Sequence, residues 1–141
     1  MKKNILFICT GNAVRSQMAH AFFNELTDFE HNVYSAGISP AGVHRMTKLV
    51  MSEIDISLVN HTSNHVNEML DIEFDYIIVL CEVAFLSLPK FKGNYKLLKW
   101  FIDDPIRIIG SSERKEKAFV FTRNLIENKV KEFIKSEFSA Q

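Results

Sequence analysis

The chain has 141 residues and a mass of 16.3 kDa, the size of one ordinary domain. Hydrophobic residues make up 47% of it and charged residues 24%, a composition that excludes disorder and low complexity. The 17 basic and 17 acidic side chains cancel, which argues against nucleic acid or an acidic membrane as a partner. We therefore expect residues 1–141 to form one globular domain with its own core.

The start of the chain resembles a targeting signal only superficially. Two lysines precede the apolar run 5–9, but that run is too short for a signal peptide, and no small-residue cleavage site precedes Cys9. We interpret the run as a buried strand and expect a cytoplasmic protein without a membrane span. Its two cysteines, Cys9 and Cys81, are then free thiols in a reducing compartment.

Strands and helices are predicted to alternate along the chain. A continuous apolar run typical of a strand buried on both faces occupies residues 4–9. Further strands are predicted at residues 33–36, 74–80 and 95–100. Helical spacing covers residues 15–27, 40–54 and 113–138, with shorter helices near residues 62–70 and just before Pro89. In the helix opened by Pro40 and Gly42, Leu49 is expected to face inward. This alternation predicts an α/β domain with a parallel sheet and right-handed crossovers.

Several chemically useful residues directly follow predicted strands. Cys9, Gly37, Cys81 and the Asp103–Pro105 loop each do so. Ligands of open α/β sheets bind beyond the carboxyl ends of the strands. These residues are therefore expected to meet at one edge of the sheet.

The main functional signal is the segment from Cys9 to Ser16, between the first strand and the first helix. A loop of this length curls so that successive backbone N–H groups form an anion nest, to which the helix adds the positive end of its dipole. Arg15 can hold two oxygens of a tetrahedral anion in a bidentate fork, and the Ser16 hydroxyl can bond the sulfur. These effects favour the thiolate of Cys9. Gly11 is expected to allow a close backbone approach or a positive φ. The predicted oxyanion-binding residues are Thr10, Gly11, Asn12, Ala13, Val14, Arg15 and Ser16.

Together with Ser35–Gly37 and Asp104–Pro105, this loop resembles the low-molecular-weight tyrosine phosphatase family. Within that family the chain is most similar to the arsenate reductase branch coupled to thioredoxin. The matching segments are residues 9–12, 15–19, 60–63, 79–81 and 103–105. The resemblance implies a single three-layer domain with a four-stranded parallel sheet flanked by helices. It also implies that the Cys9 thiolate attacks arsenic or phosphorus, with Arg15 binding the oxyanion and Asp104 as general acid.

Cys81 distinguishes the two activities of the family. In the reductases, a second cysteine at this position attacks the sulfur of the first, releases arsenite and leaves a disulfide. The phosphatases release their product with water and need no second thiol. The same position also suits a small buried residue at a strand end, so a packing role stays open. The sequence favours an arsenate reductase, with a phosphatase of phosphotyrosine or small aryl phosphates as the alternative. An oxyanion-binding protein without turnover is a third interpretation.

The chain also departs from the reductase pattern. The third cysteine of those enzymes is Leu88 here, so a disulfide would be reduced directly, by glutathione, glutaredoxin or another thiol rather than by a thioredoxin relay. Residues 106–108 follow Asp104–Pro105 where the phosphatases often carry tyrosines, which weakens the phosphotyrosine interpretation. We predict no cofactor and no metal, because His20 and Asn64 replace the acidic ligands of the potassium site seen in the branch. For His20 we expect a surface or capping role.

Overall fold

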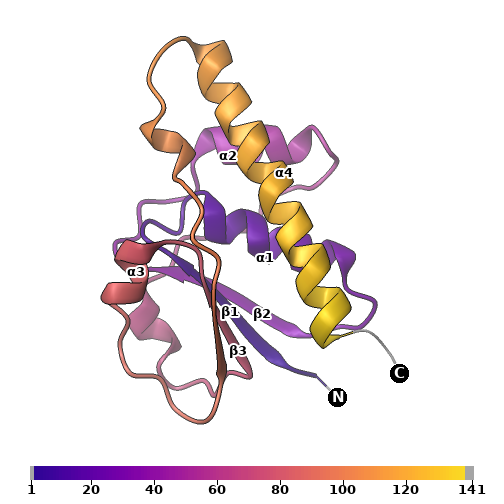
Figure 1. Ribbon diagram of the computed structural model, residues 1–141, viewed down its shortest axis with the longest axis vertical. Coiled ribbons are helices and arrows are strands. Elements are labelled where there is room, and N and C mark those ends of the chain that lie inside the picture. The colour runs from indigo at the N-terminus through magenta and orange to yellow at the C-terminus, as the bar shows by residue number, and fades with distance from the viewer. Residues whose placement is uncertain (1, 139–141) are drawn as a thin grey trace.

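The computed structural model describes residues 2–138 and contains four strands and four α-helices in alternation (Figure 1). The strands are β1 (Asn4–Cys9), β2 (Asn32–Gly37), β3 (Tyr76–Val79) and β4 (Lys96–Lys99). The α-helices are α1 (Arg15–Leu26), α2 (Arg45–Ser52), α3 (Glu82–Leu86) and α4 (Ser112–Glu137), and the 3₁₀-helices are η1 (Val66–Met69) and η2 (Pro105–Arg107). None of the helices within residues 2–138 is long and apolar enough to cross a membrane.

The four strands form one parallel sheet in the order β2-β1-β3-β4. This confirms the predicted fold class, a four-stranded parallel sheet flanked by helices. In the register, Cys9 lies opposite Gly37 on β2, and Ile8 lies opposite Val79 on β3. All carboxyl ends of the strands therefore point to the same edge, and β1 carries Cys9 to the middle of that edge.

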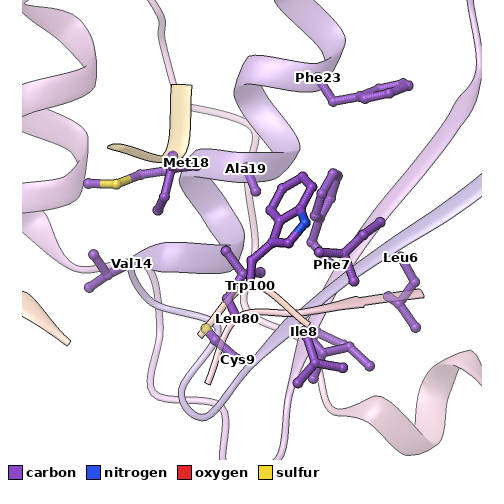
Figure 2. Close-up of a cluster of buried hydrophobic side chains, with 14 of the residues drawn as sticks. Leu6, Phe7, Ile8, Cys9, Val14, Met18, Ala19, Phe23, Leu80 and Trp100 are labelled. Carbon is purple, nitrogen blue, oxygen red and sulfur yellow. The ribbon is translucent and has the colours of Figure 1, made fainter. Parts of the chain in front are cut away.

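The central strand is covered on both faces, which makes the domain three-layered. Ile5, Leu6, Phe7 and Ile8 are consecutive and have no exposed surface, so helices or loops must cover both sides of the strand. Helices α1 and α4 pack together over one face (Figure 1). On that face the ring of Phe7 contacts both Phe23 of α1 and Trp100, while Ile8 points to the other side (Figure 2).

Helix α2 differs most from the sequence prediction. It begins at Arg45, where the His44 side chain accepts a hydrogen bond from the N–H of Met46, and not near Pro40. Residues 38–44 are instead irregular, with bends at Ile38 and Ser39 and a left-handed Gly42 (φ 82°), and they donate backbone hydrogen bonds to the Cys9–Arg15 loop. Leu49, predicted to face inward, is 44% exposed because the shorter helix turns Met46 and Val50 toward the core instead.

Candidate functional site

The loop between β1 and α1 is held from outside by its carbonyl oxygens. The carbonyls of residues 10, 11 and 13 accept hydrogen bonds from the backbone N–H groups of Ser39, Ala41 and His44, at 2.8 to 3.0 Å. The carbonyl of Asn12 accepts from the side-chain amide of Gln17 at 2.9 Å. Four successive peptide carbonyls are thereby turned away from the centre of the loop.

The opposite ends of the same peptide units are left without partners. Within residues 2–138, the N–H groups of residues 11–14 donate to no protein acceptor. The first turn of α1 is also open, because Val14 at its N-cap gives no side-chain cap and no acidic residue follows. Unpaired amides at a helix N-terminus are the arrangement that binds tetrahedral anions.

Asn12 orders the loop and fixes the hydrogen bond at the candidate nucleophile. Its backbone is left-handed, with φ 47°, and its buried side-chain oxygen accepts the N–H of Asn64 at 2.8 Å. Its side-chain nitrogen therefore points the other way and donates to Ser16 Oγ at 2.7 Å. Ser16 is left to donate its own hydrogen to Cys9 Sγ, 2.9 Å away. A sulfur that accepts such a bond is stabilised as a thiolate.

Gly37 provides the close approach that the sequence prediction assigned to Gly11. A Cβ at position 37 would lie 2.7 Å from the carbonyl oxygen of Thr10 and 2.8 Å from the nitrogen of Asn12. A Cβ at Gly11 would meet its nearest atoms at an ordinary 3.7 Å, and Gly11 has no positive φ. The end of β2 thus fits against the loop only because residue 37 has no side chain.

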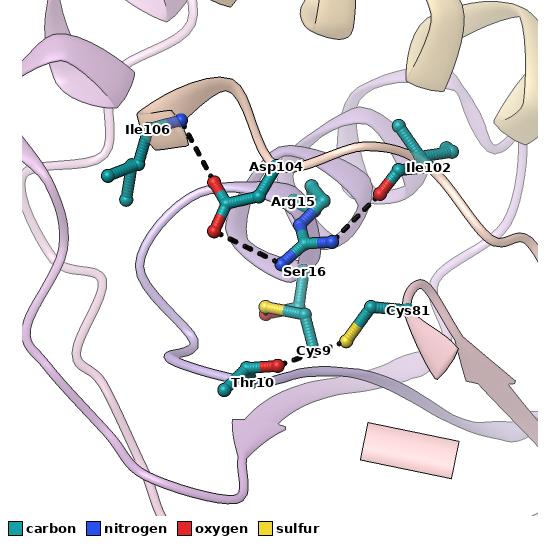
Figure 3. Close-up of polar contacts among 8 residues, drawn as sticks. All are labelled: Cys9, Thr10, Arg15, Ser16, Cys81, Ile102, Asp104 and Ile106. Carbon is teal, nitrogen blue, oxygen red and sulfur yellow. Dashed lines mark hydrogen bonds and ion pairs between the residues drawn. The ribbon is translucent and has the colours of Figure 1, made fainter. Parts of the chain in front are cut away.

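Arg15 and Asp104 come together above the loop (Figure 3). The Arg15 guanidinium donates to the carbonyl of Ile102 at 2.8 Å and lies 3.4 Å from the Asp104 carboxylate. Arg15 is buried, and its Nε has no partner in the described chain, so one donor of the guanidinium remains for a ligand. The other oxygen of Asp104 accepts the N–H of Ile106 at 3.0 Å, which fixes the direction of the carboxylate at the start of η2.

The second thiol lies beside the first. Cys81 follows β3, and its sulfur lies 3.1 Å from the Thr10 hydroxyl, on the side of the loop that carries Cys9 (Figure 3). Both sulfurs are free thiols. The structure therefore brings the two cysteines, Arg15 and Asp104 to one edge of the sheet. In the sequence, Cys9 and Asp104 are 95 residues apart.

A cavity of about 450 Å³ opens at this edge and is lined by Thr10, Arg15, Cys81, Asp104 and Arg107, among others. A larger groove of about 650 Å³ runs along α2, but it holds none of the predicted site residues. We place the chemistry in the smaller cavity because it alone combines a thiol, a buried guanidinium and a carboxylate.

Behind the loop, Gln17 connects it to a pair of histidines. Gln17 donates to the carbonyls of Asn12 and Thr62, both at 2.9 Å, so its side-chain oxygen must accept, and His61 Nδ1 is the donor at 2.9 Å. The His61 ring lies 4.9 Å from that of His20, whose Nδ1 is 3.1 Å from Ser35 Oγ. His20 is only partly exposed and lies within α1 rather than at its end, so the surface or capping role expected for it is wrong.

Burial and the neighbouring His61 lower the pKa of His20 from 6.5 to about 4, and burial also lowers the pKa of His61. The residues that line the cavity here, of about 280 Å³, include no carboxylate to offset this effect. Both imidazoles are therefore neutral near pH 7 and serve as uncharged hydrogen-bonding groups behind the loop. Sequence reasoning missed Gln17 and His61 in this role, because Gln17 meets His61 and Thr62 across 44 and 45 positions of the chain.

Some of the site residues predicted from the sequence line the cavity, and the others lie in or beneath the loop. Those of the predicted set that line it are Thr10, Arg15, Cys81 and Asp104. Gly11, Asn12, Ala13 and Val14 form the loop wall with their backbone, and Cys9 and Ser16 lie beneath it, 2% exposed and fully buried.

Comparison with known proteins gives a match over almost the whole chain. A family described as "Low molecular weight phosphotyrosine protein phosphatase" matches residues 4–140. Arsenate reductase 2 of Staphylococcus saprophyticus is 38% identical over 132 residues, covering 94% of this chain and 96% of that protein.

Two solved structures have a similar fold. An arsenate reductase in its reduced state superposes with a TM-score of 0.78 at 26% identity, covering 96% of this chain and 98% of the other. Wzb of Vibrio vulnificus, solved in complex with benzylphosphonate, gives a TM-score of 0.78 at 22% identity, covering 96% and 99%.

The close approach at Gly37 generates the first prediction. Gly37→Ala should lower the free energy of unfolding by about 1–3 kcal/mol, since its Cβ must displace loop backbone. It should also weaken the binding of phosphate. Gly11→Ala is the matched control, because its Cβ meets only ordinary contacts. Urea unfolding and phosphate titration of both variants check this. If the two variants have equal free energies of unfolding, the loop accommodates the Cβ at position 37 without cost, and the prediction is wrong.

The second prediction concerns the pH dependence of stability. Since the pKa of His20 is about 4 in the folded chain and near 6.5 when unfolded, the unfolded state binds more protons between these values. The folded state should therefore lose up to about 3 kcal/mol from this residue as the pH falls from 6.5 toward 4. Urea unfolding from pH 7.5 to 4.5 should show a shallower slope for His20→Gln than for the unmodified chain. Identical slopes would contradict the neutral, buried state of His20.

Proposed function

Because the chain belongs to the low-molecular-weight phosphotyrosine protein phosphatase family, we propose that it reduces arsenate with Cys9 as nucleophile and Cys81 as resolving thiol. The observation that carries this proposal is the second free thiol in the site, whose sulfur lies 3.1 Å from the hydroxyl of Thr10 in the Cys9 loop. The similarity to arsenate reductase 2 of S. saprophyticus supports it. A phosphatase needs the loop, Arg15 and Asp104, but it has no use for Cys81.

The sheet geometry allows the two cysteines to form a disulfide. Ile8 lies opposite Val79, so Cys9 is one residue and Cys81 two residues beyond a matched pair on neighbouring strands. With strands about 4.8 Å apart and a rise of about 3.3 Å per residue, this places the Cα atoms at about 6 Å. Disulfides span about 4.4–6.8 Å between Cα atoms, so a small shift of the loop is sufficient.

The first step is attack by the Cys9 thiolate on arsenic. Arsenate takes the place offered by the unpaired loop amides and the free Nε of Arg15. As the S–As bond forms, one As–O bond breaks, and Asp104 gives its proton to the departing oxygen, which leaves as water. The Asp104 carboxylate lies against the guanidinium that would bind the anion, and so close to the departing oxygen. Because its side chain is 27% exposed, solvent can reach it.

The second step reduces the arsenic. The Cys81 thiolate attacks Cys9 Sγ, a sulfur–sulfur bond forms, and the S–As electron pair passes to arsenic, which leaves as arsenite. Two cysteine thiolates lose two electrons in total, and As(V) gains them. Thr10 lies 3.1 Å from Cys81 and orients its sulfur in the cavity.

A thiol donor must then reduce the Cys9–Cys81 disulfide to two thiols. The cytoplasm, where we expect the protein, is a compartment that supplies such donors. At position 88, where the reductases have a third cysteine, this chain has a leucine that packs against the hydrophobic core. The disulfide thus stays at the site cavity and must be opened there. We propose a thiol such as glutathione, alone or with glutaredoxin, in preference to a thioredoxin relay.

The alternative function is hydrolysis of phosphate esters at the same loop. Water would then cleave a cysteinyl-phosphate, and Cys81 would be a buried residue at a strand end. The similarity to Wzb in complex with benzylphosphonate extends only to the fold. Ile106 and Phe101 are about half exposed near the cavity, so apolar surface for an aryl group does exist there. This observation keeps the phosphatase as the second candidate.

Replacing the second thiol separates the two functions. Cys81→Ser should reduce multiple-turnover arsenate reduction with glutathione at least about 100-fold, because no disulfide can form. It should change hydrolysis of p-nitrophenyl phosphate by less than about threefold. Cys9→Ser is the matched control and should abolish both reactions. Arsenite release and nitrophenol absorbance provide the two measurements.

The opposite pattern would overturn the reductase. If Cys81→Ser reduces arsenate as fast as the unmodified chain, Cys81 is a packing residue. If the unmodified chain hydrolyses p-nitrophenyl phosphate but reduces no arsenate with any thiol donor, the phosphatase takes its place.

A further inference from the structure

We propose that the groove along α2 binds one molecule of an amphiphilic anion, such as a medium-chain carboxylate. Its head group lies at Arg45 and Lys48, and its apolar chain lies along Leu49 and Val59. None of these residues belongs to the site at Cys9, so the proposal is independent of the proposed function.

One wall of the groove is the outer face of α2. The residues of this wall are spaced by three and four along the helix, so they share one face: Arg45, Lys48, Leu49 and Ser52. The buried residues of α2 occupy the opposite face: Met46, Thr47, Val50 and Met51. Leu49 is therefore an apolar side chain on the outer face, where it is 44% exposed. The core does not cover it, but a ligand in the groove can.

The second wall is the segment 56–59, which follows the end of the helix. Asp55 has a left-handed backbone with φ 63°, and the N–H of Ile56 donates to the carbonyl of Met51 at 3.0 Å, which closes the last turn. At the far end of the segment Val59 is apolar and 80% exposed. The two walls enclose about 650 Å³, within the range of about 300–1,000 Å³ that is usual for small-molecule sites.

The charges of the groove are separated along its length. Arg45 and Lys48 are exposed in the first turn of α2, and neither makes an ion pair within residues 2–138. Asp55 lies beyond the other end of the helix, and a rise of about 1.5 Å per residue places it more than about 10 Å along the chain from Arg45. An anionic head group is therefore attracted to the start of the helix and repelled from its end. This pattern suits a ligand with one anionic head and an apolar chain.

The size of the groove and the charge of the chain favour a free small molecule over a protein or a membrane. Nine residues line the groove, whereas a standard protein interface takes about 20–30 residues from each partner. The 17 basic and 17 acidic side chains of the chain give no general attraction to an anionic membrane. One amphiphile in solution satisfies both the two cations and the apolar walls.

Calorimetric titration with decanoate tests the site. Saturating phosphate is present throughout, so that a carboxylate gains nothing from the Cys9 loop, and decanoate stays below its critical micelle concentration. One decanoate should bind per chain, roughly four- to fifteenfold more tightly than octanoate, the effect of two further methylenes placed on apolar surface. Decanedioate should bind more weakly than decanoate, because its second carboxylate meets Asp55. No heat of binding, equal affinities for decanoate and octanoate, or displacement of decanoate by phosphate would each overturn the proposal.

Replacing the two cations tests where the head group lies. Arg45→Gln/Lys48→Gln should weaken decanoate binding about three- to tenfold, the effect of two exposed ion pairs, and should leave the binding of uncharged 1-octanol unchanged. Lys90→Gln/Lys115→Gln is the matched control, because it removes two exposed cations that do not line the groove. Equal weakening by the two double variants would show that decanoate responds only to the total charge of the chain, and the proposed position of the head group would be wrong.

Other occupants of the groove give different results. If the chain sediments as a dimer that Val59→Asp dissociates, a second copy of the chain covers the groove. If the chain binds vesicles of phosphatidylglycerol and phosphatidylcholine, and Arg45→Gln/Lys48→Gln abolishes this, the groove faces a membrane. Either result would overturn the proposal of a free ligand. A monomer that ignores the vesicles and binds decanoate would support it.

Discussion

The site depends on one constraint: the peptide units from Thr10 to Ala13 are held with their carbonyls outward. The irregular segment 38–44 and the Gln17 side chain hold them there, because both supply N–H donors to those oxygens. Among residues 2–138 the amide ends then have no protein partner, and they converge in front of the first helix. Because the backbone is fixed beforehand, an anion that binds there need not reorganise it. Cys9 and Ser16 lie beneath the same loop, so nucleophile and anion site are positioned together.

The same constraint explains why the sequence predicts some parts of the molecule and not others. The strands and the loop from Cys9 to Ser16 are local patterns, and the parallel sheet then brings Cys81 and Asp104 to the same edge. Residues 40–44 look like the start of a helix, but the N–H groups of Ala41 and His44 donate to the loop instead. Gly37 and His20 owe their roles to contacts with residues far along the chain, which no local pattern contains.

With two thiols at adjacent strand ends, two reactions are conceivable at this site: hydrolysis of a phosphate ester and reduction of arsenate. In the proposed mechanism the loop, Arg15 and Asp104 treat arsenate and phosphate alike, since both are tetrahedral anions of similar charge. Only the second sulfur distinguishes a reaction that ends with hydrolysis from one that ends with electron transfer. Both sulfurs are buried, and the side chain of Cys81 lines the site cavity while Cys9 lies beneath the loop.

The most direct test of the account is the protection of Cys9 by a bound anion. In Cys81→Ser, where Cys9 is the only cysteine, iodoacetate labelling should be at least about tenfold slower with saturating phosphate than with sodium chloride of equal ionic strength. Such protection requires that the anion occupy the loop directly above the sulfur. Equal labelling rates in phosphate and chloride would show that the loop is not an oxyanion site, and the proposed chemistry at Cys9 would be wrong.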